Sequence, residues 1–260
     1  LVSELGRRLD EWPLDVRLGR MLVEGERLAC LEELLVIPAV LSIQDPRERP
    51  LDQKEAAQAA HRRFNDAKSD FLALLNIWNA VHDQWEKLRT QNQRRKFCRQ
   101  NFLSYLRMRE WQDLHAQLHD ALENLGTLKL NESNAAYDAI HRSILAGLVG
   151  QVARREERNL FQATAGRKVT VFPGSTLYDR SPPSRKPADR NSKAKPESNR
   201  SSQPLWIVAG EIVETSQLFA RTIAGIEPGW IYQLAPHCCK VTHTNPHWSP
   251  TAGRVLAEEV

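Results

Sequence analysis

The stretch SDFLALLNIWNAVHDQWEKLR, residues 69–89, decides the fold class of the first half of this chain. Its large apolar residues recur at intervals of three and four: Phe71, Leu74, Leu75, Trp78, Val81, Trp85 and Leu88. That spacing is typical of one face of an α-helix. Ser69 occupies the N-cap position and Asp70 the first turn, where an acidic side chain favours a helix. We therefore predict a helix over 69–89 with one apolar face.

The residues on both sides of this stretch have the same period. We expect further helices over 15–24, 26–43, 95–125 and 134–150. Pro38 should kink or split the second of these, because proline lacks the N–H that a helix needs. Gly126 should end the third, as glycine ends many helices. No period of 20–50 residues repeats, so the sequence predicts a helical bundle rather than a solenoid.

After about residue 150 the pattern changes to short alternating segments, which are typical of strands. We expect strands near 169–172, 205–210 and 218–223, and a short helix after Pro228. Several short strands with one small helix favour a five-stranded Greek-key barrel of the OB type. The predicted fold class is therefore α+β, a helical bundle followed by a small barrel.

The basic surplus of the chain is concentrated in one segment. The 260 residues include 36 Lys+Arg and 32 Asp+Glu, a net charge of +4. Segment 179–203 alone has seven basic and three acidic residues, which accounts for the whole surplus. It also has six serines, four prolines and no aromatic or large aliphatic residue. Such a segment cannot bury enough apolar surface to offset its ordering entropy, so we predict a disordered insertion.

The remaining composition narrows the class of protein. Cys30, Cys98, Cys238 and Cys239 show no spacing of a disulfide framework, so we expect reduced thiols and a cytoplasmic location. No stretch approaches 18 apolar residues without a charge, so we expect no membrane span and no membrane partner. The first residue is Leu1 rather than Met. We interpret the chain as a piece of a longer protein.

The motifs of common enzymes are missing. The sequence has no G-x-x-x-x-G-K-[S/T], G-x-G-x-x-G, H-E-x-x-H, G-x-S-x-G or D-E-x-H pattern. We therefore predict no catalytic residue in this chain. A cluster near the end could in principle bind zinc, but its spacing matches no standard finger, and we expect no metal site. The residues of that cluster are His237, Cys238, Cys239, His243 and His247.

Two stretches could bind a nucleic acid. Residues 87–109 have eight basic residues and no acidic one, with Phe97, Phe102 and Tyr105 between them. They could follow a phosphate backbone and stack bases, or they could be a solvated helix face whose aromatics are core. The sequence leaves both open. The second stretch, RKVTVFPGS (167–175), could be an oligonucleotide-binding barrel strand or an ordinary strand with two charges at its entry.

At these residues the chain resembles the bacterial HrpA-type DEAH-box ATP-dependent RNA helicases, in the C-terminal part beyond their motor. The resemblance implies three domains: the end of a winged-helix domain over 1–22, a ratchet-like helical domain over 23–140, and an OB-fold domain over 141–260 that the chain's end could truncate. Val16 stands where the family usually has proline. The first domain matches on LGRRLDEWPLDVRLGRML, and the second on ACLEELLVIPAVLSIQDPRERP, HRRFNDAKSDFLALLNIWN and FCRQNFLSYLRMREWQDLHAQL. The third matches on VTVFPGSTLY, WIVAGEIVETSQLFARTIAGIEPGWI and NPHW.

The resemblance also implies a function. The parent protein would hydrolyse ATP with Mg²⁺ in two RecA-like motor domains, which are absent here, and would move along single-stranded RNA. This part would close the RNA channel and grip the strand, with no cofactor of its own. Its partners would be single-stranded RNA, the motor domains and helicase partner proteins. The alternative is a protein-interaction platform without RNA contact. The residues that we predict to contact RNA are Arg94, Arg95, Lys96, Arg99, Arg167, Lys168, Thr170, Phe172, Gly174 and Ser175.

Overall fold

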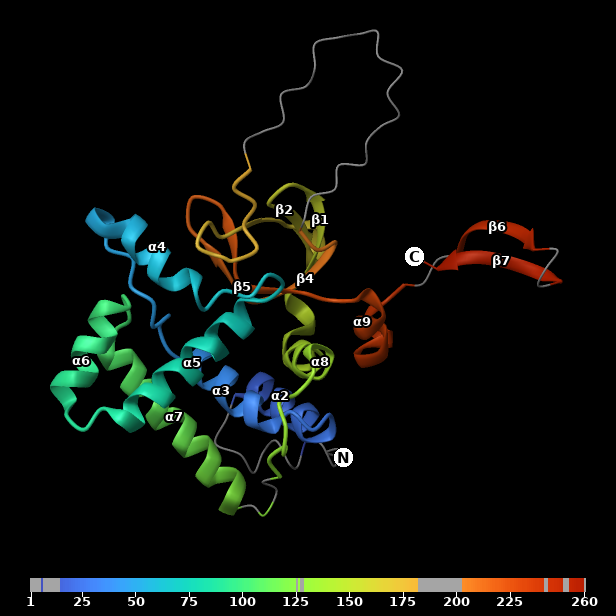
Figure 1. Ribbon diagram of the computed structural model, residues 1–260. Coiled ribbons are helices and arrows are strands. Elements are labelled where there is room, and N and C mark those ends of the chain that lie inside the picture. The colour runs from blue at the N-terminus through green and yellow to red at the C-terminus, as the bar shows by residue number, and fades with distance from the viewer. Residues whose placement is uncertain are drawn as a thin grey trace, which may run out of the picture. The chain divides into compact units, whose positions relative to one another are not determined.

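The computed structural model describes residues 6, 15–124, 126, 129–181, 203–240, 243–249 and 253–259. They fall into two compact units, Leu1–Ile226 and Glu227–Val260. The first unit has a helical region followed by a closed barrel of five strands (Figure 1). The predicted α+β fold class, with a barrel of the OB type, is confirmed.

The helical region contains one 3-10 turn, η1 (Leu51–Gln53), among α-helices of very different character. The α-helices are α2 (Val16–Arg27), α3 (Leu31–Leu41), α4 (Lys54–Arg62), α5 (Asp70–Lys87), α6 (Gln91–Gln100), α7 (Tyr105–Asn124) and α8 (Tyr137–Leu148). Helix α5 begins as the sequence predicts, because the Ser69 side chain accepts a hydrogen bond from the Leu72 amide. Gly126, with φ at 67°, follows the end of α7 in the left-handed conformation that favours glycine.

Two breaks between helices lie where the sequence analysis did not expect them. The predicted split at Pro38 is wrong: α3 continues across this residue, and nearly all of its side chains are buried. The break expected between the helices over 15–24 and 26–43 lies a few residues later, at Ala29, whose φ is 52°. The single helix predicted over 95–125 is two helices, because Phe102 turns the chain with a φ of 51°. Packing outweighs local propensity at both places.

Helix α4 was not predicted at all. Its sequence, KEAAQAAHR, has good helix formers but no apolar stripe. Only Ala57 and His61 in it are buried. A helix that buries so little gives no periodic signal for sequence analysis to detect.

The barrel has the strand order β1-β2-β3-β5-β4 and closes by pairing β4 with β1. Strands β3 and β5 run parallel, and the other neighbours run antiparallel. The predicted strands correspond to β3, β4 and β5, whereas β1 and β2 were missed because β1 reads VARREE and shows little apolar alternation. The strands are β1 (Val152–Glu157), β2 (Leu160–Ala163), β3 (Lys168–Val171), β4 (Trp206–Glu214) and β5 (Leu218–Gly225), with 3-10 turns η2 (Val149–Gln151) and η3 (Thr164–Gly166).

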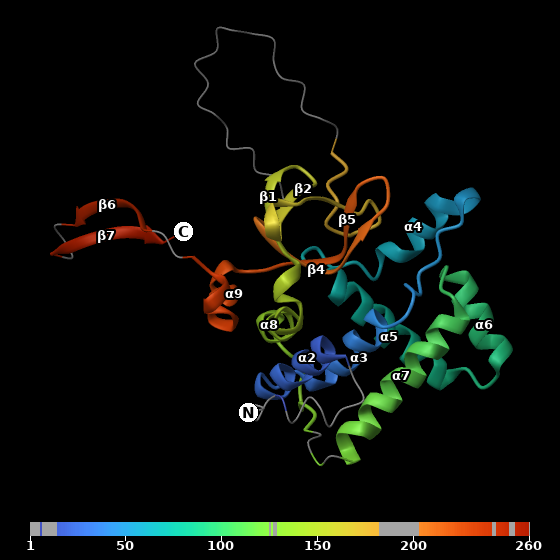
Figure 2. The same cartoon turned by 180° about the vertical axis from the view of Figure 1, so that it is seen from behind.

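A buried carboxylate joins the helical region to the barrel. Asp70, 1% exposed at the start of α5, accepts hydrogen bonds from the Ser175 hydroxyl (2.6 Å), the Thr176 amide and hydroxyl (both 2.8 Å) and the Ile223 amide (3.0 Å). All of these donors belong to the barrel part of the chain. Figures 1 and 2 show the start of α5 against β5 from both sides.

The predicted insertion, 179–203, lies between β3 and β4, and its residues 182–202 fall outside the described part of the chain. Its two ends meet at Asn159, in the turn between β1 and β2. The Asn159 side chain exchanges hydrogen bonds with the Asp179 backbone, both 2.9 Å, and accepts one from the Gln203 amide at 2.7 Å. Gln203 is therefore a buried, bonded residue and not part of a disordered segment, which corrects the predicted boundary.

The second unit contains α9 (Pro228–Leu234), the turn η4 (Pro236–Cys238) and a two-stranded sheet of β6 (His243–Ser249) and β7 (Arg254–Glu259). The short helix after Pro228 is as predicted. Trp248 and Val255 are cross-strand neighbours in the sheet, and each is 62% exposed.

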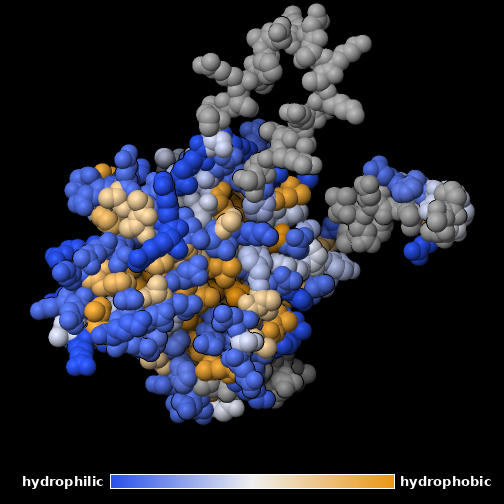
Figure 3. Space-filling view, in the orientation of Figure 1, coloured by the Kyte–Doolittle hydropathy of each residue, from blue (hydrophilic) through white to orange (hydrophobic). Residues whose placement is uncertain are grey.

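In the part of the chain that the structure describes, no helix combines the length and the apolar character that crossing a membrane requires. Figure 3 shows a mostly hydrophilic face, with hydrophobic side chains gathered over the region of α2, α3 and α8.

Candidate functional site

A short segment between α3 and η1, residues 45–49 of SIQDPRERP, is fixed against the turn that separates α6 from α7. The Glu48 amide donates to the Phe102 carbonyl, and the Ser104 amide to the Pro46 carbonyl, both at 2.8 Å. The Arg107 guanidinium of α7 donates to the Asp45 carbonyl at 3.0 Å. These bonds hold the segment where the helical region faces the barrel.

Two arginines of this segment share one carboxylate. Arg47 Nη2 lies 2.8 Å from Asp45 Oδ2, whereas Arg49 Nη1 is 4.0 Å from the same oxygen. Burial alone would raise the pKa of Asp45, but Arg47 and then Arg49 outweigh it and hold that pKa below its usual value. Burial and the neighbouring Arg47 lower the pKa of Arg49. Of the two arginines, Arg49 therefore has the weaker ion pair with Asp45.

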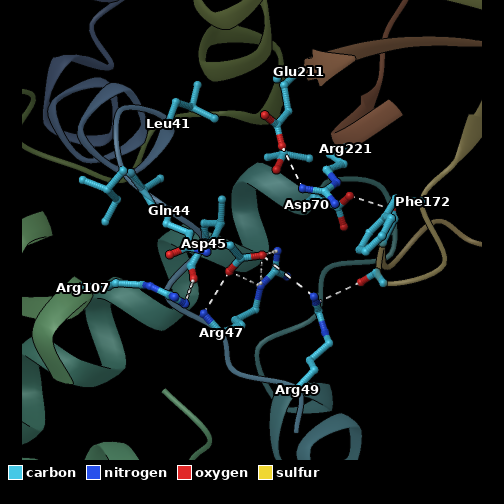
Figure 4. Close-up of a pocket in the computed structure, with 17 residues that line it drawn as sticks. Leu41, Gln44, Asp45, Arg47, Arg49, Asp70, Arg107, Phe172, Glu211 and Arg221 are labelled. Carbon is cyan, nitrogen blue, oxygen red and sulfur yellow. Dashed lines mark hydrogen bonds and ion pairs between the residues drawn. The ribbon is translucent and has the colours of Figure 1, made fainter. Parts of the chain in front are cut away.

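The segment lines a cavity of about 350 Å³ between α3, α5, α7 and the barrel (Figure 4). Figure 4 shows Arg47, Arg49 and Arg107 directed toward Asp45. On the barrel side, the Arg221 guanidinium lies 4.6 Å from the centre of the Phe172 ring and 3.5 Å from a Glu211 oxygen. Acidic and basic side chains therefore alternate around this cavity.

A second cavity, of about 560 Å³, extends along α4 and shares five lining residues with the first: Arg47, Arg49, Phe172, Gly174 and Ser175. Among the described residues that line it, none is acidic. Its cationic side chains are Arg47, Arg49, Lys54, Arg62 and Arg180, and its aromatic ones are Phe172, Tyr178 and His61. This basic, aromatic hollow, which we call the α4 cavity, is suited to a phosphate-bearing ligand.

The predicted residues of the strand and turn divide into two groups. Phe172, Gly174 and Ser175 line both cavities. Arg167 and Lys168 are exposed, with Lys168 3.3 Å from Glu156, and Thr170 is half-buried on β3; none of the three lines either cavity.

The turn itself is built differently from the sequence prediction. Ser175, one of the predicted RNA contacts, is 4% exposed, and its hydroxyl donates to Asp70. Gly174 is needed for close packing, because a Cβ there would lie 2.6 Å from Phe172 Cε1. Arg49 donates to the Gly174 carbonyl at 3.3 Å. The turn thus positions Arg49 and Phe172 at the α4 cavity.

The predicted basic stripe on α6 lies apart from these cavities, since none of Arg94, Arg95, Lys96 and Arg99 lines them. Arg94 donates to the Leu88 and Trp85 carbonyls, at 3.2 and 2.9 Å, and so satisfies the C-terminal end of α5. Arg95 is exposed, with its guanidinium 5.2 Å from the Tyr105 ring. Lys96 and Arg99 are also exposed.

Sequence reasoning missed the arginines that surround the cavities. Arg47 and Arg49 belong to SIQDPRERP, which was used only as evidence of family resemblance. Asp45 and Glu48 lie between and beside these arginines, so the segment has no charge surplus to attract attention. Lys54 and Arg62 are on the unpredicted helix α4.

The absence of a metal site stays a prediction. Within the described residues, the group of side chains whose ligand atoms lie close together is His119, Asp120 and Glu123 on the surface of α7. His247 Nδ1 lies 3.0 Å from the Asn245 carbonyl, and the Cys239 thiol lies 3.5 Å from the Ala235 carbonyl. The side chain of His243 falls outside the described ones.

Known proteins match the chain in both of its parts. A family model described as an oligonucleotide/oligosaccharide-binding (OB)-fold matches residues 140–238, and one described as the helicase associated domain (HA2), ratchet-like, matches residues 15–74. The chain is 38% identical over 259 residues to the ATP-dependent RNA helicase HrpA of Escherichia coli (strain K12). It is 37% identical over 260 residues to the HrpA homolog of Haemophilus influenzae.

These matches span nearly all of this chain, 99% and 100%, but 18% of the length of each HrpA protein. A more distant relative, the probable ATP-dependent RNA helicase DHX35 of Pongo abelii, is 26% identical over 91% of this chain and 29% of its own length. These matches confirm the resemblance seen in the sequence: over nearly its whole length the chain is similar to a part of the HrpA-type DEAH-box RNA helicases, and it contains ratchet-like and OB-fold regions.

Proposed function

We propose that this chain is the part of an RNA helicase that grips single-stranded RNA, and that the strand passes through the α4 cavity. The observation that carries the proposal is the lining of that cavity, where cationic and aromatic side chains gather without an acidic one. Cations neutralise phosphates, and aromatic rings stack bases whatever their sequence. Binding should therefore be tolerant of sequence and sensitive to salt.

The contact residues of this proposal differ in part from those predicted from the sequence. Phe172 and Gly174 are kept, because they line the cavity, and Arg49, Lys54 and Arg62 are added. The exposed residues Arg167 and Lys168, the half-buried Thr170 and the α6 stripe remain predicted contacts, although they line neither cavity. Ser175 is left out of the contact set, because its hydroxyl is bonded to Asp70.

The test is a titration of a fluorescent single-stranded RNA at several salt concentrations, with the chain and with a Lys54→Gln/Arg62→Gln variant. Both side chains are exposed, so the variant should fold normally. Each cation that contacts a phosphate contributes about 0.7 to the slope of log affinity against log salt for single strands. We expect the variant to lose about 1.4 from that slope. An unchanged slope would place the RNA elsewhere.

The activity of the whole helicase is part of the same proposal. ATP and Mg²⁺ would bind the motor domains of the parent protein, in the cytoplasm, and this chain alone should not hydrolyse ATP. Purified chain that turned over ATP, with contaminants excluded, would contradict this. The alternative function, a platform that docks partner proteins without RNA, gains if the chain binds no RNA at low salt.

A further inference from the structure

One polar atom at the α4 cavity has no hydrogen-bond partner among the described residues, Nδ1 of His61. His61 lies in the last turn of α4 and is 6% exposed. Its Nε2 is 3.0 Å from the Phe102 carbonyl oxygen, which can only accept a hydrogen bond. Nε2 therefore carries the proton and donates. In a neutral ring of this tautomer, Nδ1 is an acceptor.

The ring is held neutral by its surroundings. Burial lowers the pKa of His61, and the nearby Arg49 and Arg47 lower it further, against the opposite effect of the bond to Phe102. Nδ1 thus remains an acceptor at neutral pH. The other buried side-chain atoms without a partner in the described part of the chain are nitrogen donors of Trp85, Arg142 and Arg221. The His61 atom is the acceptor in this group.

A buried acceptor without a partner is costly, and it needs a donor from outside the protein. The cationic lining of the α4 cavity selects a ligand with negative charge. An RNA backbone combines both properties, because every phosphate is next to a ribose 2′-hydroxyl, which DNA lacks. We propose that Nδ1 of His61 accepts a hydrogen bond from a ribose 2′-hydroxyl, so that the α4 cavity distinguishes RNA from DNA.

This inference rests on the proposed RNA function and adds its chemical selectivity. Because Nδ1 is buried, a hydroxyl reaches it only when a neighbouring side chain moves. Arg62 and Asn65 line the same cavity and are exposed, so they are the side chains able to shift. The bond therefore forms on binding, while the Arg49 and Lys54 side chains meet phosphates whether the sugar is ribose or deoxyribose.

The experiment measures the affinity of the full chain for three oligonucleotides of about 12 nucleotides, a length within the range of OB-fold sites. They are oligouridine RNA, the same oligomer with deoxyuridine, and the same oligomer with 2′-O-methyluridine, so that the bases are identical. We expect the RNA to bind about three- to tenfold more tightly than the other two, the range for a single hydrogen bond.

In the variant His61→Leu this ratio should fall to about one, through weaker RNA binding alone. His61→Gln keeps a donor for Phe102 and an acceptor oxygen, so it should retain part of the preference. His82→Leu, on the exposed face of α5, is the matched control and should retain all of it. The ratio is measured within each variant, so a loss of stability does not imitate the effect.

Equal affinity of the unchanged chain for RNA and DNA would overturn the His61 inference and leave the proposed function standing. A preference for RNA that survives in His61→Leu would do the same. No binding of either nucleic acid would overturn both.

Discussion

Two arginine-bearing regions of the first unit differ in the charge of their sequence and in the exposure of their side chains. The α6 stripe has Arg94, Arg95, Lys96 and Arg99 close together in sequence, and three of these four side chains are exposed. The segment 45–49 has two arginines with acidic neighbours, and Arg47, with its side chain 8% exposed, lies at the helix–barrel junction. The stripe is conspicuous in the sequence, whereas the segment is enclosed in the fold.

The difference shows that charge density in a sequence does not locate the cavities that the fold encloses. An exposed cation is screened by salt and interacts weakly. A cation beside a low-dielectric wall and short of acidic partners, as Arg49 is, keeps more of its attraction for a phosphate. Enclosure depends on contacts between distant segments, such as the bond from Arg49 to the Gly174 carbonyl.

The largest expected effect comes from removing the contact that creates the enclosed region. Asp70→Ala leaves two amides and two hydroxyls of the barrel part without their acceptor. Unsatisfied buried donors should lower the free energy of unfolding by about 3 kcal/mol or more. Denaturant unfolding followed by circular dichroism measures this loss.

The matched control for that variant is Asp83→Ala, on the exposed face of the same helix. It should change the free energy of unfolding by less than about 0.5 kcal/mol. If Asp70→Ala were as mild as this control, the junction would not depend on the carboxylate, and the enclosure of the α4 cavity would need another explanation.

The second prediction is that the free energy of unfolding depends on pH through His141, which is bonded to Ser69 beside Asp70. His141 is fully buried; it accepts from the Ser69 hydroxyl at Nε2 (2.7 Å) and donates to the Tyr137 carbonyl at Nδ1 (2.7 Å). Burial lowers the pKa of His141 from 6.5 to about 4. The unfolded chain therefore binds the proton more readily, so stability is complete above pH 6.5 and decreases as pH falls toward 4.

The expected loss between these two pH values is about 3 kcal/mol, from the size of the pKa change. The measurement is the free energy of unfolding from pH 7.5 to 4.5, for the chain and for His141→Gln. The variant should lose stability less steeply over this window. Other histidines titrate in both proteins and cancel in the difference, so equal slopes would contradict the assignment.

The sequence analysis predicted only the local role of the two residues at the start of α5. Ser69 and Asp70 were assigned to the start of a helix, and the structure confirms that start. That Asp70 also binds the barrel depends on residues more than 100 positions away, which no local pattern contains. In the same way, Phe172 and Gly174 were found from the β3 turn, but the helix opposite them, α4, has no apolar stripe and was missed.

The third prediction compares the α4 cavity with the α6 stripe. Lys54→Gln/Arg62→Gln in the α4 cavity and Arg95→Gln/Arg99→Gln in the stripe each remove two exposed cations. We expect the cavity pair to weaken RNA binding about tenfold at moderate salt, and the stripe pair about twofold. Fluorescence anisotropy measures both. Equal losses would mean that total charge, and not position at the α4 cavity, governs the affinity.

The smallest expected effect concerns segment 179–203, which holds the basic surplus of the chain. It is the strictest test of whether the number of cations or their position determines RNA affinity. Replacing residues 182–201 by a short Gly/Ser loop removes six basic side chains. The bonds of Asn159 to Asp179 and Gln203 lie outside the replaced stretch and hold the two ends of the loop together. Since loop closure changes by only about 0.6 kcal/mol for each doubling of length, the melting temperature should stay nearly constant.

If position at the α4 cavity governs RNA affinity, this replacement should also weaken binding less than the loss of Lys54 and Arg62, although it removes three times as many cations. The salt slope should fall only by the share of these side chains that contact phosphate. An Asn159→Ala variant is the complementary control, because it releases the loop ends and keeps every charge; it should lower the melting temperature and leave the salt slope unchanged. A loss of affinity that followed the number of removed charges, in the cavity, stripe and loop variants alike, would show that a position at the α4 cavity gives a cation no special role.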